Sequence, residues 1–323
     1  NSRISLSNND SGTSNTIFGK NAGDSDGAAD LNVFIGELAG GTGTQTDDAD
    51  SNVGIGYRAL TDLTEGTHNI AIGKDSATNM LGGDMNIAIG SDTLYTSTAA
   101  IHSIAIGKNA MYGGTASSST GSIAIGYDSL RNVSSGVGNV AVGYEAGNAI
   151  ADDNNNTLIG YQSGKVTTGA DNTYVGFSAG KGAAGAESNN VGVGSGALTA
   201  ITDGGRNVAI GKDAFVSLTG GLYNVAIGYQ AGYGTVSADT NTFIGYQAGY
   251  AITASGNVVI GRQAFATASS VVNNVCIGHH AMQAVPSGQA INDCVSIGYQ
   301  ALHGSASTTT GIDGTVAIGK DAL

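Results

Sequence analysis

The pentapeptide Asn-Ile-Ala-Ile-Gly at residues 69–73 recurs 17 residues later at 86–90, and near variants of it occur eighteen times in the 323-residue chain. We call the last residue of each copy the repeat glycine. Ten of the seventeen intervals between repeat glycines are 17 residues long, and the others range from 16 to 21. The repeat glycines are Gly19, Gly36, Gly56, Gly73, Gly90, Gly107, Gly126, Gly143, Gly160, Gly176, Gly194, Gly211, Gly228, Gly245, Gly261, Gly278, Gly298 and Gly319. Self-similarity at so short a period predicts one supersecondary unit stacked on itself, a solenoid.

The three residues before each repeat glycine have the pattern of a β-strand. The first is Val, Ile or Thr in every copy, and the third is Ile or Val in every copy except that of Phe18. These positions are two apart and therefore share one face of a strand, where β-branched side chains favour an extended backbone. We expect them to form the core face. The position between them, often Ala, is expected to face outward, where its small size would let a partner chain approach.

The remainder of each coil carries signals for a return of the chain. Three residues after the repeat glycine stands Ala, Ser or Thr, and seven after it an apolar residue is frequent, as at Leu63 and Met80. This apolar position predicts a second short strand, and clusters such as Thr-Asp-Gly-Gly at 202–205 predict the turn back. We therefore expect an all-β fold, a parallel β-solenoid (β-roll) of about 18 coils of roughly 17 residues. Residues 1–14 would form a lead-in segment and residues 15–323 the repeat shaft.

Asparagine stands four residues before the repeat glycine in fourteen copies. Asn tolerates left-handed backbone, and identical amides stacked one strand apart can hydrogen-bond to one another as a ladder. We call the residues at one position of the repeat, taken over successive coils, a column, and we interpret this column of asparagines as structural. Its members include Asn69, Asn86, Asn139, Asn156, Asn207, Asn224 and Asn241.

The repeat carries a family resemblance. Asn-Ile-Ala-Ile-Gly at 69–73, Ser-Ile-Ala-Ile-Gly at 103–107 and Asn-Val-Ala-Ile-Gly at 207–211 resemble the head repeat of YadA-type trimeric autotransporter adhesins, which is similar to repeats of phage tail-fibre shafts. The resemblance covers Asn15 to Leu323 and implies a left-handed parallel β-roll assembled as a homotrimer. The coils are a few residues longer than is usual in autotransporter heads. The opening residues 3–10 look more like phage tail-fibre proteins, whose shafts often precede a chaperone domain, and no such domain lies within these 323 residues.

The composition of the chain argues against two kinds of partner, nucleic acid and the membrane interior. The net charge is −13 with only 12 basic residues, which argues against nucleic acid because phosphate binding needs a basic stripe. No run of about twenty apolar residues occurs, so we expect no membrane insertion. The chain lacks a signal peptide and an initiating Met, which is typical of a fragment or a processed product.

Aromatic residues follow the repeat glycine in several coils. They form a run at Tyr127, Tyr144, Tyr161 and Phe177 and a pair at Tyr229 and Tyr246, and Tyr57 and Tyr299 are isolated. Rings stacked at strand spacing would make an aromatic ladder, either a candidate contact for a receptor or glycan or a purely structural stack. Basic residues occupy the same place elsewhere, at Lys20, Lys74, Lys108, Lys212, Arg262 and Lys320, and are interpreted as a solvated edge with weak ion pairs.

Other reactive residues form no catalytic constellation. The histidines, His68, His102, His279, His280 and His303, are spread over the turns. Cys276 and Cys294 fall two columns apart in neighbouring coils, so no disulfide is expected between them. Asp24, Asp26 and Asp30, and likewise Asp47, Asp48 and Asp50, faintly resemble a calcium loop without its full ligand spacing. We expect no enzyme activity, no cofactor and no metal.

Three functions remain open from the sequence. The first is a structural attachment fibre, a trimeric phage tail-fibre or virion-fibre shaft, with a bacterial surface adhesin as its variant. The second is a glycan-binding solenoid that uses the aromatic ladder, and the third an ice-binding solenoid, for which Thr is too rare in the strand column. We expect an extracellular location, with itself and a host receptor or glycan as partners. Direct contacts are expected in the enlarged turns, at Gly41–Ser51, Gly113–Gly121, Val285–Asp293 and His303–Gly314, one of which holds Pro286.

Overall fold

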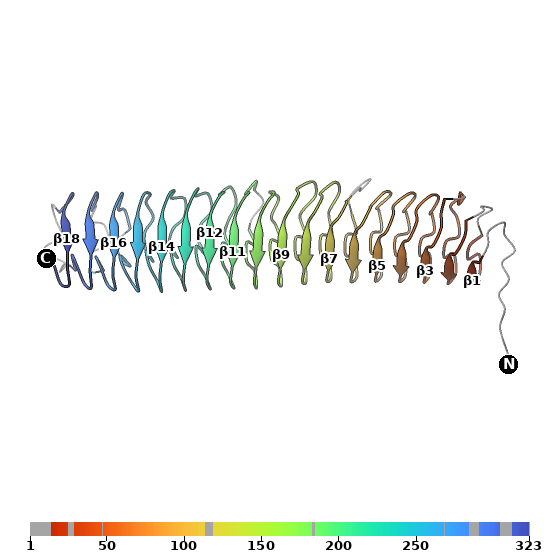
Figure 1. Ribbon diagram of the computed structural model, residues 1–323, viewed down its shortest axis with the longest axis horizontal. Helices are drawn as coiled ribbons and strands as arrows, with labels where there is room; N and C mark the ends of the chain where they lie inside the picture. Colours follow the sequence, from red (N-terminus) through yellow and green to blue (C-terminus); the bar gives the residue numbers. More distant parts are fainter. Residues whose placement is uncertain are drawn as a thin grey trace, which may run out of the picture. The chain divides into compact units, whose positions relative to one another are not determined.

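The computed structural model describes residues 14–24, 29–46, 48–113, 119–182, 185–267, 269–283, 291–303 and 312–322. These form two compact units, unit 1 (Asn1–Ile159) and unit 2 (Gly160–Leu323). Each unit is a parallel β-solenoid in which successive coils contribute one short strand (Figure 1). The lead-in segment expected at residues 1–14 lies, except for Ser14, outside the described residues.

The strands coincide with the three residues before the repeat glycines. Unit 1 holds β1(Thr16–Phe18), β2(Val33–Ile35), β3(Val53–Ile55), β4(Ile70–Ile72), β5(Ile87–Ile89), β6(Ile104–Ile106), β7(Ile123–Ile125), β8(Val140–Val142) and β9(Thr157–Ile159). Unit 2 holds β10(Thr173–Val175), β11(Val191–Val193), β12(Val208–Ile210), β13(Val225–Ile227), β14(Thr242–Ile244), β15(Val258–Ile260), β16(Val275–Ile277), β17(Val295–Ile297) and β18(Val316–Ile318). Within each unit consecutive strands pair in parallel and in register, as Ile70 does with Ile87. The predicted parallel β-solenoid is confirmed.

The second strand of each coil was predicted wrongly. In the described part of the chain, the segments between the strands consist of turns and bends, with isolated parallel β-bridges such as that between Gly205 and Leu222 but no second strand. The apolar residues seven after the glycine are nevertheless buried, as Leu63, Met80 and Leu218 show. These side chains point into the coil from a turn. A side chain needs only this inward orientation to be buried, and its backbone need not be extended.

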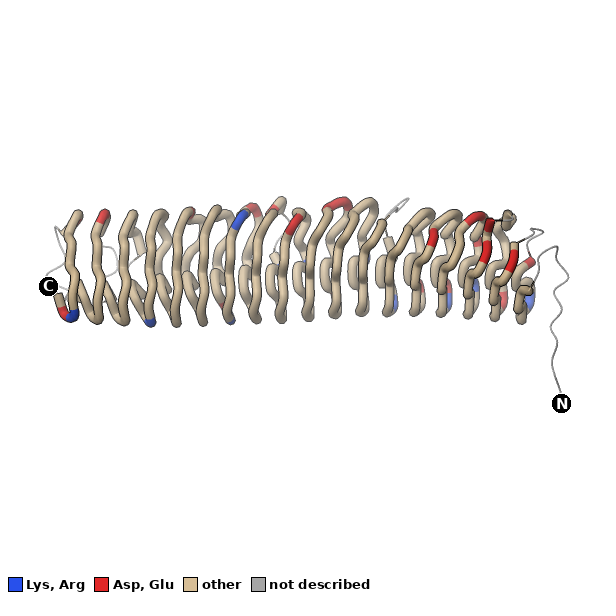
Figure 2. The backbone as a smooth tube through the Cα atoms, in the orientation of Figure 1, with Lys and Arg blue, Asp and Glu red and all other residues tan. Residues whose placement is uncertain are grey.

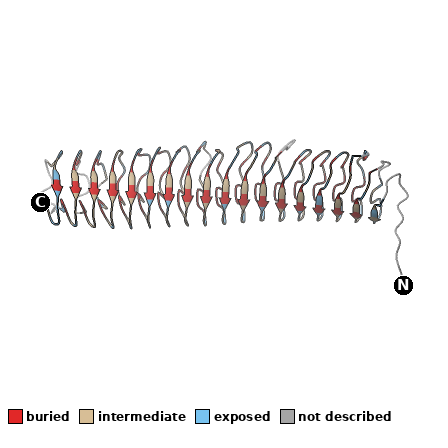
Figure 3. Cartoon of the chain, in the orientation of Figure 1, coloured by how far each residue is buried: buried red, intermediate tan, exposed pale blue. Residues whose placement is uncertain are grey.

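The facing of the strands is the reverse of the prediction. Ala71, expected to face outward, is fully buried, whereas Ile70 and Ile72 on either side of it are each 36% exposed. The same alternation holds along the stack, so single strands combine buried and less buried residues (Figure 3). The Val and Ile columns are therefore the outer face of the sheet, and the Ala column is the inner one. The prediction failed because it placed the larger apolar side chains inside.

The interior of the coil is narrow, and two positions fill it in a complementary way: where one holds a large side chain, the other holds a small one. The middle strand residue faces the residue four after the repeat glycine. Where the strand residue is large, its partner is Gly, and a Cβ on Gly40 or Gly249 would overlap the ring of Phe34 or Phe243 of its own coil. Where the strand residue is small, the partner is large and buried, as in the pair Ala209 and Phe215. One large side chain per coil is thus the usual filling, and it requires the Ala column to point inward.

The repeat glycine is fixed by two constraints at once. Gly73 has a φ of 140°, a conformation that only glycine adopts readily. A Cβ on Gly73 would also overlap the carbonyl oxygen of Gly90, the repeat glycine of the next coil. The turn expected at this position is present, and the close approach of backbone to backbone accompanies it.

The column of asparagines forms a buried ladder of hydrogen bonds. The Nδ2 of Asn224 donates to Asn207 Oδ1 at 3.0 Å and to the carbonyl oxygen of Ala238 at 2.7 Å. Asn224 Oδ1 in turn accepts from the backbone N–H of Asn241 at 2.9 Å and from Asn241 Nδ2 at 3.2 Å. The left-handed backbone lies one residue earlier, as at Tyr223 (φ 59°), rather than at the asparagine itself. The Asn224 amide therefore hydrogen-bonds to the coils before and after its own, and it also joins the beginning of its own coil to the end of that coil.

Candidate functional site

The aromatic row after the repeat glycines is exposed and stacked. Tyr127 and Tyr144 lie in unit 1 with ring centroids 5.3 Å apart and planes 11° from parallel. In unit 2, the rings of Tyr161 and Phe177 are also 5.3 Å apart, at 6°. The second predicted pair, Tyr229 and Tyr246, stacks at 5.3 Å and 16°. The two rings of each of these pairs come from consecutive coils, which sets the ring separation near the strand spacing.

Cations and aromatic rings belong to one column in unit 2, although the sequence suggested two separate features. Lys212 Nζ lies over the Tyr229 ring, 5.8 Å from its centroid, and Arg262 Cζ lies over the Tyr246 ring at 5.7 Å. Both outer faces of this tyrosine pair are thus covered by a cation. The column continues through Arg262 Nη1, 2.9 Å from His279 Nε2, and through the edge contact of the His279 and Tyr299 rings at 5.5 Å.

An amide row that the sequence analysis missed runs beside this column. Gln247 Nε2 donates to Gln230 Oε1 at 2.9 Å, and Gln263 Nε2 donates to Gln247 Oε1 at 3.0 Å. His280 Nε2 lies 3.1 Å from Gln263 Oε1 and ends the row. The sequence did carry a signal for this row, because three consecutive coils have Gln two residues after the repeat glycine. The row ties coils together on the surface as the asparagines do in the interior.

The stacking limits what the Tyr229 and Tyr246 rings can bind. Sugar rings contact aromatic side chains mainly through the ring face, and here one face of each ring meets the other ring and the opposite face meets a cation. The two residues are 38% and 44% exposed. This geometry favours the structural interpretation of the pair over face-on glycan binding.

A second aromatic row, five residues after the repeat glycine, was also missed. Tyr95 and Tyr112 stack in unit 1 with centroids 5.1 Å apart, and Arg131 lies over the Tyr112 ring at 5.3 Å. Tyr233 and Tyr250 stack in unit 2 at 4.9 Å and 7°. Tyrosine pairs with a separation of 17 residues were visible in the sequence, but only their common column reveals them as a row.

The histidine pair sits within the surface rows of unit 2. The rings of His279 and His280 are 3.9 Å apart. Burial lowers the pKa of His280 below its ordinary value of 6.5, and the neighbouring His279, Arg262 and His303 lower this pKa further. His68 and His102, by contrast, lie in unit 1 in left-handed backbone at exposed turns.

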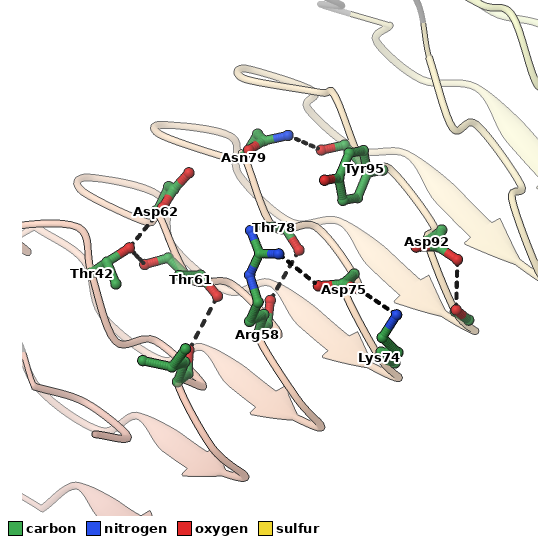
Figure 4. A network of polar contacts seen from close by, with 12 residues as sticks. Thr42, Arg58, Thr61, Asp62, Lys74, Asp75, Thr78, Asn79, Asp92 and Tyr95 are labelled. Carbon is green, nitrogen blue, oxygen red and sulfur yellow. Dashed lines mark hydrogen bonds and ion pairs between the residues drawn. The ribbon is translucent and has the colours of Figure 1, made fainter. Parts of the chain in front are cut away.

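Ion pairs follow the repeat glycines, as expected of a solvated edge. Lys74 Nζ is 3.0 Å from Asp75 Oδ2, and Arg58 Nη1 is 3.4 Å from Asp75 Oδ1, so one carboxylate links two coils (Figure 4). The hydrogen bond from Lys74 to Asp75, with their mutual attraction, raises the pKa of Lys74. Lys212 pairs with Asp213 at 3.7 Å and Lys320 with Asp321 at 3.5 Å. The Lys320 pair is exposed on both sides and should contribute little to stability, whereas the Asp75 side chain is only 8% exposed.

The remaining candidate residues show no shared centre. Cys276 and Cys294 are free thiols, both buried, in the Ala column and the Asn column respectively. Within the described ranges, no group of three or more His, Cys, Asp and Glu side chains could hold a metal ion. Asp26 and Asp47 of the calcium-like clusters lie outside the described residues, as do large parts of the enlarged turns, Pro286 included.

The outer face of the sheet is an apolar surface in each unit. Both outward positions of every strand are Val, Ile, Thr or Phe, and none is charged. In unit 2, Ile210 is 39% exposed and Ile227 36% exposed. Large contiguous apolar surfaces are rare on monomeric proteins and are typical of interaction sites. The face thus has the composition of an interface.

Comparison with known families and with curated proteins gives no match for this chain. In the part of the chain that the structure describes, no helix has the length and apolar character needed to cross a membrane.

Proposed function

We propose that this chain forms the shaft of a homotrimeric attachment fibre, a phage tail fibre or related virion fibre that acts outside the cell. The observation that carries the proposal is the uncharged outer face of the sheet, with two β-branched columns in each unit. Three copies related by a threefold axis could bury this face against one another. The number three, and left-handed coils, come from the resemblance of the repeat.

The contacts between coils suit a load-bearing role. Consecutive coils are joined within each unit by strand pairing, in most coils also by the buried amides, and in some coils by the surface rows of rings and glutamines. A pull along the stack is therefore shared among several hydrogen bonds at every step.

We propose that the role in host recognition is mechanical and non-catalytic, with direct contacts in the enlarged turns. A bacterial surface adhesin would use the same shaft, and flanking sequence distinguishes the two: a chaperone or tip domain indicates a phage, a coiled-coil stalk and membrane anchor a bacterium.

The assembly can be tested on the outer face itself. We expect light scattering of the full chain to give three times the chain mass of 31.8 kDa. The double variant Ile210→Asp/Ile227→Asp places two charges on the face and should dissociate the assembly, while circular dichroism stays that of a β-fold. Its matched control, Lys212→Ala, lies just past the same strand and should leave the mass unchanged. A wild-type chain that is folded and monomeric at micromolar concentration would contradict the proposal.

The attachment role needs a separate experiment. An antibody raised against this chain should label the length of a fibre in electron micrographs of the particle or cell that carries it. Label confined to a capsid, or to the cell interior, would refute the attachment role even if the chain were trimeric.

A further inference from the structure

The coils of β13 and β14 are joined on their surface by two stacked tyrosine pairs. Tyr229 and Tyr246 stack one residue after the repeat glycines, and Tyr233 and Tyr250 stack five residues after them. Their centroid separations are 5.3 and 4.9 Å, with planes within 16° and 7° of parallel. We call these four residues the tyrosine seam. The faces of the paired rings oppose each other across one coil spacing.

The seam is accessible from solvent and each pair is self-contained. None of the four tyrosines is buried. Lys212 and Arg262 flank the Tyr229 and Tyr246 rings in the column after the repeat glycine, so each of these rings has the other as its stacked phenol in that column. A radical formed on either ring would therefore meet one reaction partner before any other.

We propose that the tyrosine seam is a site of oxidative cross-linking, where a haem peroxidase with hydrogen peroxide joins Tyr229 to Tyr246 and Tyr233 to Tyr250 as dityrosine. The oxidant removes one electron and one proton from each phenol. The two tyrosyl radicals form a carbon–carbon bond between ring positions ortho to the hydroxyls, and each ring hydrogen at the new bond moves to a phenolate oxygen. One peroxide is reduced to two water molecules for each bond formed.

Held in pairs, the rings gain the advantage of proximity, because coupling within a fixed pair does not wait for a second chain. The product ties residues that are 17 apart in the sequence and adjacent in the stack. Each bond is a covalent staple between two coils, and the seam can hold two of them. The cross-linked chain should unfold at a higher temperature, since the staple restricts the unfolded chain as a disulfide does.

Peptide mapping can locate the bond. Cleavage before aspartate separates the seam into peptides 213–238 and 239–292, because Asp213, Asp239 and Asp293 are consecutive acidic residues. After oxidation of the full chain with horseradish peroxidase and peroxide, we expect these peptides to be joined, with dityrosine fluorescence and a loss of two hydrogen atoms per bond. The yield of the joined peptide should be roughly tenfold higher for the folded chain than for the chain in urea.

The variants separate pairing from simple exposure. Tyr229→Phe/Tyr233→Phe keeps both stacks but removes one phenol from each, and it leaves the exposed Tyr223 in the same peptide. It should abolish the link between the two peptides if pairing decides the reaction. Tyr299→Phe removes a tyrosine whose neighbours in its column are His279 and Lys320, and it should leave the link unchanged. A link that survives the double variant, one that uses Tyr223 as often as the seam, or cross-links found only between chains would overturn the proposal.

Discussion

Units 1 and 2 have the same kind of interior and differ in their surfaces. Unit 1 has 17 acidic and six basic residues, a net charge of −11, whereas unit 2 has eight acidic and six basic residues, a net charge of −2. Figure 2 shows the acidic positions of unit 1 on its turns. The asparagine column is broken in unit 1 by Ser103 and Ser122, and in unit 2 it runs through seven consecutive coils from Asn172 to Asn274. Strand pairing and the repeat glycine constrain both units equally, which leaves the surface free to diverge.

The largest effect should be the same in both units. Gly73→Ala in unit 1 and Gly228→Ala in unit 2 each place a Cβ against the carbonyl oxygen of the next repeat glycine, at φ values of 140° and 137°. We expect each to lower the free energy of unfolding by at least about 4 kcal/mol, because neither backbone can shift away from the other. Urea unfolding followed by circular dichroism measures this loss.

Two other glycines serve as controls for the glycine variants. A Cβ on Gly82 in unit 1 or on Gly220 in unit 2 would meet nothing within 4 Å. Alanine there should change the free energy of unfolding by less than about 1 kcal/mol. If Gly73→Ala cost no more than Gly82→Ala, the backbone contact between coils would not be the shared constraint that we describe.

The asparagine column should distinguish the units. Asn224→Ala in unit 2 removes four hydrogen bonds in the interior and leaves buried partners unsatisfied, so we expect a loss of about 4 kcal/mol. Ser122→Ala in unit 1 removes a contact of 3.5 Å to the Gly136 carbonyl oxygen and one of 3.2 Å from the Asn139 N–H, and should cost about 1 kcal/mol. Hydrogen exchange of peptides from each unit reports the two losses separately, and equal losses would show that the unbroken ladder adds nothing.

The smallest effect concerns pH, where the units should respond in opposite directions. The pKa of His280 is lowered in the folded state, so the unfolded chain binds this proton more readily and unit 2 should lose stability as the pH falls below about 6.5. Burial, with the nearby Asp152, raises the pKa of Asp153 above 3.8, so unit 1 should gain stability as the pH falls through that raised pKa. Each effect should be under about 1 kcal/mol, since both groups are largely solvated.

Two conservative variants test the pH responses. His280→Gln continues the amide row and should remove the acid sensitivity of unit 2, and Asp153→Asn should remove the gain in unit 1. Hydrogen exchange at pH 7 and pH 5 provides the measurement of unit 2. A pH response that persists in both variants would assign it to other groups.

The sequence predicted the architecture because the repeat glycine marks a backbone contact that no other residue permits. It failed at the facing of the strands, because Ile70, Ala71 and Ile72 are all apolar and hydrophobicity alone does not say which of them lies inside. The answer depends on the residue four after the repeat glycine, such as Phe215, which occupies the interior opposite the strand. The candidate site was predicted in part: the stacked pairs were expected, but rings and cations were considered separately although Arg262 and Tyr246 share a column.

The exchange of volume inside single coils has a consequence for how such a chain can evolve. Phe243 and Gly249 occupy the same coil, as do Phe34 and Gly40, so most coils carry their own complete filling. A genetic duplication or deletion of one repeat would then add or remove a self-sufficient module without disturbing its neighbours. Two coils are different, because their own pair of positions is Ala and Gly. Phe215 and Phe243 of the adjacent coils approach Gly232, and Leu130 and Leu158 of the adjacent coils approach Gly147. Gene rearrangements should be tolerated at most coil boundaries and should be selected against at those that border these two coils.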